Sequence, residues 1–130
     1  MTFKIIKIFL ILFFATFLCG CGDSGSSSEL TGYYQTGTAT FRSAELHGLL
    51  LASGEKYDRN ALTGAHREFA FDTWVEVTNL ENGRRITVRI NHRLDEDAES
   101  LIEVSEKAAS DLGMKISGMA EVTLKIVAGP

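Results

Sequence analysis

The side chains best suited to proton transfer are gathered between residues 47 and 66. This stretch holds His47, Glu55, Asp58 and His66, separated by three glycines. Imidazole and carboxyl groups serve as general acids and bases, and glycine lets a backbone adopt positive φ or approach a ligand closely. Such residues on a loop held by a rigid scaffold are typical of a functional site. Taken alone, however, the stretch is more typical of a polar surface loop with solvated charges.

A β-hairpin is the clearest of the elements that would have to position this stretch. Residues 74–80 read WVEVTNL, an alternating and β-branched pattern that predicts a strand. Asn82 and Gly83 follow, and this pair indicates a hairpin turn because both residues tolerate positive φ. The return strand is predicted over residues 84–91.

Three more strands are predicted over residues 37–41, 101–104 and 120–127, and a short helix follows the second of them. Ser105 is expected to cap this helix, and Gly113 to end it. These are five located strands and one helix, and we expect about six short strands in all, which makes the chain mainly β. We expect a small closed barrel, because closure removes exposed strand edges.

The first residues have the pattern of a secretory signal peptide, which we assign to residues 1–20. Lys4 and Lys7 precede an apolar run over residues 8–18, too short for a spanning helix of roughly 20 residues. We expect this segment to be the signal peptide of a lipoprotein. The alternatives are an ordinary secretory signal and an uncleaved anchor.

The sequence Leu18-Cys19-Gly20-Cys21 resembles a bacterial lipobox, which implies that Cys21 carries lipid such as palmitate. Residues 21–35 then form the lipidated cysteine and a flexible Gly/Ser tether, and residues 36–128 form one domain. Both cysteines lie at the processing site, so the mature domain has none for a disulfide or a metal. Gly22, rather than Asp, follows the lipidated cysteine, which favours the outer over the inner membrane, facing the periplasm.

The charge of the mature chain excludes some partners. Removing Lys4 and Lys7 from a formal net charge of −4 leaves −6. An acidic domain with scattered arginines is a poor nucleic-acid binder. It would also be repelled by anionic lipid, so the acyl chains and not the protein's charge should provide the membrane attachment.

The order of short motifs resembles the rare lipoprotein A (RlpA) family, and the resemblance covers most of residues 37–127. The resemblance implies a six-stranded double-psi β-barrel and a septal-ring-type lytic transglycosylase. The matching motifs are His47-Gly48, Gly54-Glu55, Tyr57-Asp58, Ala65-His66, Val77-Thr78-Asn79-Leu80, Asn82-Gly83-Arg84, Val88-Arg89-Ile90-Asn91 and Leu101-Ile102-Glu103-Val104-Ser105.

The resemblance also implies a reaction. Family members cleave peptide-stripped glycan strands of peptidoglycan between N-acetylmuramic acid and N-acetylglucosamine without water, leaving 1,6-anhydromuramyl ends. One acid that protonates the leaving oxygen and then takes the 6-hydroxyl proton could suffice, whereas ordinary glycosidases need a carboxyl pair. We expect that acid to be protonated near neutral pH through burial or a neighbouring carboxylate.

The family's catalytic residues carry over only in part. Glu55 and His66 match, but the family's Asn-Asp-Arg motif reads Asn91-His92-Arg93 here. Three explanations remain open. Glu55 transfers the proton alone, held by His66; His92 replaces the aspartate, since imidazole titrates near pH 6.5; or catalysis is lost and the groove only binds glycan.

The remaining polar residues of the motifs have two interpretations each. His47, Asp58 and Arg93 are candidate substrate-binding residues, and the structural alternatives are a loop-shaping histidine, a turn cap and an ordinary ion pair. Trp74 and Phe71 could stack on sugar rings, although aromatic residues at the start of a strand more often belong to the core.

Other classes of site and partner are less favoured. Three histidines without metal-ligand spacing do not make a metal site, and we expect no cofactor. The C-terminal glycan-binding SPOR domain that many family members carry is not expected here. A structural lipoprotein that tethers envelope layers through protein partners is a third hypothesis, which the groove motifs argue against.

Overall fold

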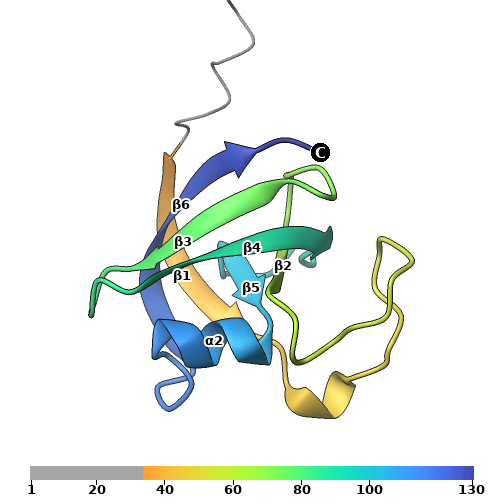
Figure 1. Ribbon diagram of the computed structural model, residues 1–130, viewed down its shortest axis with the longest axis horizontal. Coiled ribbons are helices and arrows are strands. Elements are labelled where there is room, and N and C mark those ends of the chain that lie inside the picture. The colour runs from red at the N-terminus through yellow and green to blue at the C-terminus, as the bar shows by residue number, and fades with distance from the viewer. Residues whose placement is uncertain (1–33) are drawn as a thin grey trace, which may run out of the picture.

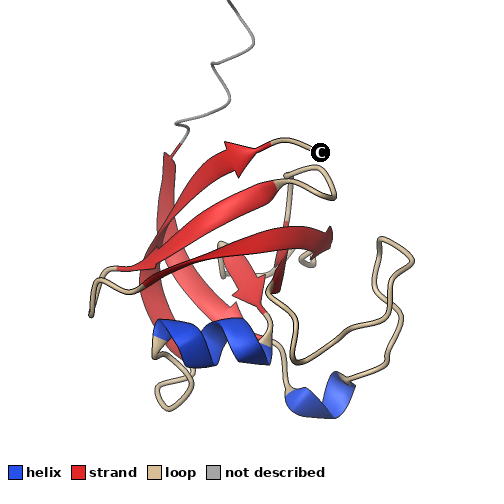
Figure 2. Cartoon of the chain, viewed as in Figure 1, coloured by secondary structure: helices blue, strands red, loops and turns tan. Residues whose placement is uncertain are grey.

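The computed structural model describes residues 34–130, and its strands form a barrel with helix α2 at one end (Figures 1 and 2). One long loop connects β1 to β2, and it contains the short 3-10 helix η3. The elements are β1 (Tyr34–Phe41), η3 (Ala44–Leu46), β2 (Thr63–His66), β3 (Trp74–Asn79), β4 (Arg85–His92), β5 (Ile102–Val104), α2 (Glu106–Leu112) and β6 (Met119–Ala128).

Within residues 34–130, the six strands close into a barrel in the order β1-β5-β2-β4-β3-β6. The pairs β1–β5 and β2–β4 are parallel, and the other pairs are antiparallel. The prediction of a closed, mainly β, six-stranded barrel is therefore confirmed. Closure leaves none of the six strands as a free edge, which suits a small domain without disulfides.

The hairpin of β3 and β4 forms as the sequence predicts. Val75 pairs with Val88 and Val77 with Ile86, and Gly83 takes a φ of 76° at the turn. The three valines are fully buried, because alternate residues of a strand face the barrel interior. This hairpin forms one wall of the core.

Helix α2 closes one end of the barrel, and its two caps are those predicted. The Ser105 side chain accepts a hydrogen bond from the Ala108 N–H, and Gly113 adopts the left-handed conformation that ends the helix. The side-chain amides of Asn79 and Asn82 both donate to the Leu112 carbonyl at 2.9 Å. The Asn-Leu-x-Asn motif therefore satisfies the end of α2 and is structural.

Strand β2 was not expected from the sequence, which suggested a loop across residues 47–66. All four residues of β2 are buried, and the strand lies between β5 and β4. Thr-Gly-Ala-His has no β-branched alternation, so pairing on both sides, and not local propensity, makes it a strand. Only the part of the stretch before Thr63 is a loop, which extends from one side of the barrel (Figure 1).

Several predictions fall outside the described residues. The signal peptide, the lipid on Cys21 and most of the tether belong to residues 1–33. Strand β1 begins at Tyr34, inside the range assigned to the tether. No helix among residues 34–130 has the length and hydrophobicity needed to cross a bilayer.

Candidate active site

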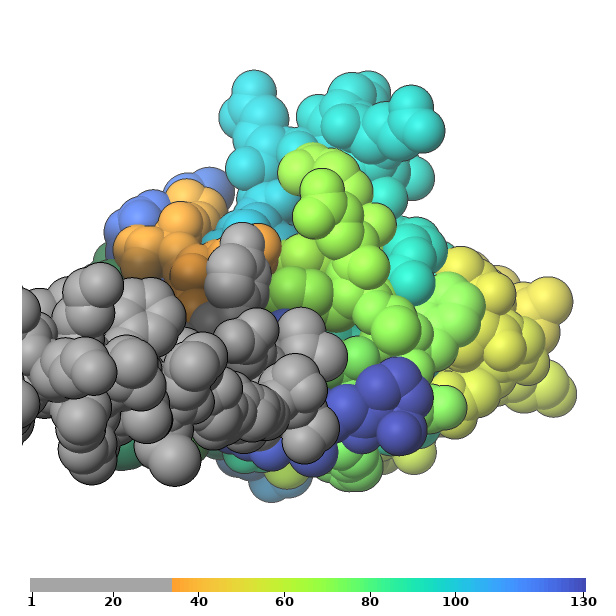
Figure 3. All heavy atoms as spheres, turned by 90° about the horizontal axis from the view of Figure 1, so that it is seen from above, coloured from red at the N-terminus to blue at the C-terminus, as the bar shows by residue number. Residues whose placement is uncertain are grey.

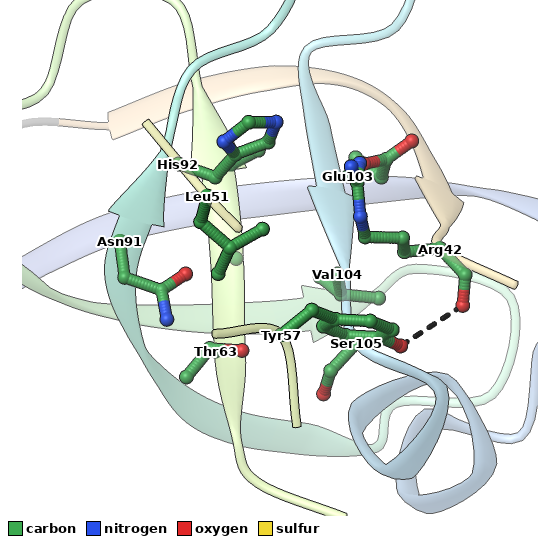
Figure 4. A pocket seen from close by; sticks show the side chains of 11 residues that line it. Arg42, Leu51, Tyr57, Thr63, Asn91, His92, Glu103, Val104 and Ser105 are labelled. Carbon is green, nitrogen blue, oxygen red and sulfur yellow. Dashed lines mark hydrogen bonds and ion pairs between the residues drawn. The ribbon is translucent and has the colours of Figure 1, made fainter. Parts of the chain in front are cut away.

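A pocket opens over β2, between the strands that flank it. Ala65 on β2 is the register partner of His92 on β4 and of Glu103 on β5. Partners in register point to the same face of a sheet, so both side chains stand over the short Ala65 methyl group. Figure 4 shows them on either side of β2. The lining also includes Arg42, Leu51, Tyr57, Thr63, Asn91 and Ser105.

His92 is fixed in the pocket by the long loop. Its Nδ1 accepts a hydrogen bond from the Ala52 N–H at 2.9 Å, which assigns the ring proton of the neutral form to Nε2. Burial lowers the pKa of His92, Arg42 lowers it further, and Glu103 and Asp95 partly oppose the shift. His92 is therefore a neutral hydrogen-bond donor at pH 7.

Glu103 is the carboxylate of this pocket, and Arg42 is its partner. The Arg42 Nη1 donates to Oε1 of Glu103 at 2.8 Å, and both side chains are largely buried. Among the described residues, the buried Nε–H of Arg42 has no partner. The pair places one positive and one negative group beside His92.

Tyr57 contacts Arg42 through both its hydroxyl group and its ring. Its hydroxyl donates to the Arg42 carbonyl at 3.0 Å and accepts the Glu106 N–H at 3.1 Å, and its ring lies 5.7 Å from the Arg42 guanidinium. Burial raises the pKa of Tyr57, which is 2% exposed. The tyrosine of the Tyr57-Asp58 motif thus joins the loop to the start of α2.

Glu55 lies at the rim of the site and not in the pocket lining. Arg89 on β4 grips both carboxylate oxygens, with Nη1 to Oε1 at 2.7 Å and Nη2 to Oε2 at 2.9 Å. Arg89 also donates to Asp72 at 2.9 Å. The hydrogen bond from Arg89 lowers the pKa of Glu55, with a smaller contribution from Asn91. The expectation that the acid is protonated near neutral pH therefore does not hold for Glu55 in this geometry.

His66 is a buried residue whose two ring nitrogens are both occupied. Its Nδ1 accepts the N–H groups of Glu68 and Phe69 at 3.0 Å, and its Nε2 lies 2.8 Å from the Gln35 side-chain oxygen. The ring also stacks on Phe69 with centroids 3.6 Å apart. Burial lowers the pKa of His66 to about 4, with contributions from Arg93 and Arg67. The hydrogen bonds of His66 therefore hold the turn after β2. The interpretation in which His66 holds Glu55 does not fit this geometry, because Glu55 is bound by Arg89.

His47 and Asp58 lie on the long loop. The Oδ1 of Asp58 accepts the Asn60 N–H at 2.9 Å, which makes it a turn cap. The Nδ1 of His47 accepts the Arg59 N–H at 3.1 Å and lies 4.0 Å from Asp58. Both side chains are more than half exposed and can meet a ligand from the loop side.

Arg93 joins two loops beside the pocket. It donates to the carbonyls of Phe69 and His66, and its guanidinium lies 4.2 Å from the centroid of the Phe71 ring. Arg67 in turn donates to the Ala98 carbonyl. These contacts hold the segment after β2 against the loop after β4, which lie side by side in Figure 3 in light green and cyan.

Sequence reasoning missed Arg42, Arg89 and Glu103 as site residues. Glu103 belongs to the recognised Leu101–Ser105 motif, where it stands between the buried Ile102 and Val104. A charged residue between two core positions of a short strand points to the opposite face, and this was the signal available.

The comparisons with known proteins agree on the family. The lytic transglycolase family model matches residues 29–124. The endolytic peptidoglycan transglycosylase RlpA of Neisseria meningitidis serogroup A is 37% identical over 98 residues, which are 75% of this chain and 41% of that protein. The probable endolytic peptidoglycan transglycosylase RlpA of Treponema pallidum is 44% identical over 88 residues, 68% of this chain and 28% of that protein. The chain thus matches less than half the length of these relatives.

Solved structures support the same fold at low sequence identity. The Streptomyces papain inhibitor has a TM-score of 0.62 at 22% identity, covering 75% of this chain and 97% of that one. The Clavibacter michiganensis expansin crystallised with cellohexaose has a TM-score of 0.59 at 19% identity, covering 75% of this chain and 54% of that one. These likenesses concern the fold alone. By the family match and the RlpA relatives, this chain belongs to the lytic transglycolase family of the RlpA proteins and contains its double-psi β-barrel domain.

Proposed function

We propose that this protein is an endolytic peptidoglycan lytic transglycosylase that cleaves peptide-stripped glycan strands and leaves 1,6-anhydromuramyl ends during cell-wall remodelling. The observation that carries the proposal is the pocket over Ala65, where His92 and Glu103 stand on flanking strands. His92 occupies the motif position at which the resemblance places an aspartate. The pocket thus keeps a carboxyl and a second polar group on the two strands that flank β2.

The reaction requires a balanced proton transfer and no water. The muramyl 6-hydroxyl attacks its own C1, the bond from C1 to the glycosidic oxygen breaks, and the bond from C1 to O6 forms. One proton leaves the 6-hydroxyl and one arrives on the departing oxygen. A single carboxyl group that can reach both oxygens can carry that proton.

In this proposal Glu55 positions the long loop and does not transfer the proton. Its ion pair with Arg89 pins the long loop to β4, and the same loop supplies the Ala52 N–H to His92. The loop also carries His47 and Asp58, which are exposed toward solvent. We therefore assign glycan binding to the loop and to Arg93 beside it, and keep His66 as the residue that shapes the turn after β2.

The alternative is a glycan-binding lipoprotein without strong catalysis. Two observations favour it: the aspartate of the motif is replaced by His92, and the lowered pKa of Glu55 makes this residue a poor proton donor.

We further propose that the protein is anchored to the envelope by lipid. Residues 1–20 would be removed, Cys21 would be acylated, and the Gly/Ser tether would hold the barrel at the outer membrane, facing the periplasm. Metabolic labelling with a palmitate analogue tests this. The parent should be labelled, and a Cys21→Ser variant should not; labelling of both would contradict the assignment.

The activity is tested with two glycan substrates and the full chain in detergent. Strands stripped of stem peptides by an amidase should release 1,6-anhydromuramyl products, while intact peptidoglycan should release far less. Binding of the stripped strands without any product would favour the alternative. Absence of both binding and product would contradict glycan recognition altogether.

A further inference from the structure

The pocket holds a carboxylate that neither the motif carry-over nor the family match assigns a role. We propose that Glu103 is the proton-carrying catalytic residue, with His92 as a neutral hydrogen-bond donor to the leaving oxygen and Arg42 as the positioning residue. This inference rests on the proposed transglycosylase function and names the groups that perform it.

Strand β2 separates His92 on β4 from Glu103 on β5 by the width of one strand. Ala65 is in register with both His92 and Glu103. Adjacent strands lie about 4.8 Å apart, so the backbones of β4 and β5 are about 10 Å apart across β2. Both side chains line the pocket that opens over this gap, together with Arg42, and we assign the glycosidic linkage to that pocket. Ala65 contributes only a methyl group to the floor, so the space remains open.

The hydrogen bonds already made decide which group can carry the proton. His92 uses Nδ1 to accept the Ala52 N–H, so its neutral ring can only donate, through Nε2. Glu55 has both oxygens occupied by Arg89. Glu103 is held by Arg42 through Oε1 alone, and its second oxygen is the one we assign to the substrate.

The proton then follows a closed path. The Glu103 carboxylate accepts the proton of the muramyl 6-hydroxyl as O6 attacks C1, and His92 donates a hydrogen bond to the departing glycosidic oxygen. As the bond from C1 to that oxygen breaks, Glu103 returns the proton to it. Glu103 ends as the carboxylate with which it began, and Arg42 keeps it oriented throughout.

Substitutions at Glu103 in the full chain test this role, with Glu121→Gln as the matched control. Glu121 is also a strand glutamate with one short side-chain hydrogen bond, to Thr38 at 2.6 Å, but it lies on β6 outside the pocket lining. Glu103→Gln should lower the rate of anhydro-product release by about 100-fold or more, the size of a general acid–base contribution. Glu103→Asp should keep more activity than Glu103→Gln, and Glu121→Gln should match the parent.

A second readout does not depend on activity. Titration of the His92 ring by NMR should give a lower pKa in Glu103→Gln than in the parent, because the carboxylate charge favours the imidazolium form. If the parent releases product and a folded Glu103→Gln variant stays within threefold of it, the inference is overturned and the transglycosylase function stands. An unchanged His92 pKa would contradict the placement of the Glu103 carboxylate beside His92 in the pocket. A parent that releases no product overturns the proposed function, and the catalytic role of Glu103 with it.

Discussion

Arg89 on β4 holds Glu55 of the long loop through two hydrogen bonds, 2.7 Å and 2.9 Å long, one to each carboxylate oxygen. A two-pronged contact between arginine and carboxylate fixes orientation as well as distance. The glutamate of the Gly54-Glu55 motif is therefore a clamp in this structure. It ties the loop to the strand that carries His92.

The clamp between Arg89 and Glu55 should contribute to the free energy of unfolding. Glu55→Gln and Arg89→Gln should each lower the free energy of unfolding by about 1 kcal/mol, a modest value because the Glu55 side chain is 44% exposed and screened by solvent. Arg89→Gln also removes the contact with Asp72, so the double variant should be little less stable than Arg89→Gln alone, which already lacks the contact with Glu55. Denaturant unfolding of the four proteins measures this coupling, and additive losses would show that the pair contributes nothing.

The pH profile of activity should be set on its acid side by His92. The ring must be neutral to accept the Ala52 N–H, and its pKa is lowered from the usual 6.5. Activity should therefore persist at pH 6.5 and fall only as the pH drops through the lower value, where protonation of Nδ1 breaks the contact.

The control for this profile is His92→Asn, whose side-chain oxygen can still accept the Ala52 N–H but does not titrate. Its acid limb should move to lower pH in measurements of the initial rate of product release. An identical acid limb in both proteins would mean that another group sets it.

His66 should make the fold acid-sensitive. Its pKa is lowered to about 4 in the folded state, so between pH 6.5 and pH 4 the unfolded chain binds a proton that the folded chain does not. Stability is therefore unaffected above pH 6.5 and falls as the pH decreases through this window, by up to about 3 kcal/mol.

Denaturant unfolding at pH 7 and pH 4 measures the loss, and His66→Gln provides the comparison. The variant should be less stable at pH 7, where the buried contacts of the ring are lost. It should nevertheless lose less stability than the parent between the two pH values. An equal loss in both proteins would assign the acid sensitivity to carboxylates such as Glu55.

Trp74 should contribute to glycan binding. It is 40% exposed at the start of β3 and is the register partner of Arg89, beside the Glu55 clamp. Phe71, in contrast, packs against the core and under Arg93. Exposed tryptophan rings stack on apolar faces of ligands, so Trp74→Ala should weaken binding of stripped glycan strands roughly tenfold, a loss of about 1.4 kcal/mol.

The chain has one tryptophan, so its fluorescence reports directly on that position. The parent should show a change in emission on adding glycan. Leu80→Ala, which removes a similarly exposed apolar side chain at the opposite end of β3, should bind as the parent does. Unchanged fluorescence together with unchanged affinity in Trp74→Ala would exclude the contact.

The parts of the fold that local patterns determine were predictable from the sequence. The hairpin over β3 and β4 follows from alternation and the Asn-Gly turn, and α2 follows from its serine and glycine caps. Strand β2 was not predictable, because its strand form depends on pairing with β4 and β5 on its two sides.

The sequence predicted some of the residues of the site, but not the contacts that determine their protonation. The motifs identified His92 and the loop that carries Glu55, but the partner of Glu55 lies 34 residues away along the chain. Only the folded strands bring Arg89 to Glu55 and place Glu103 across Ala65 from His92. A contact of this kind leaves no local pattern, so the lowered pKa of Glu55 could not be foreseen.

The most direct test of the account is mass spectrometry of peptide-stripped glycan strands after incubation with the parent, Glu55→Gln, His92→Asp and Glu103→Gln. We predict that the parent releases muramyl ends one water lighter than hydrolysis would leave, that Glu55→Gln retains part of this activity, and that Glu103→Gln loses nearly all of it. A silent parent that still binds the strands, together with product from His92→Asp, would contradict the account and identify a binding protein that lost its acid.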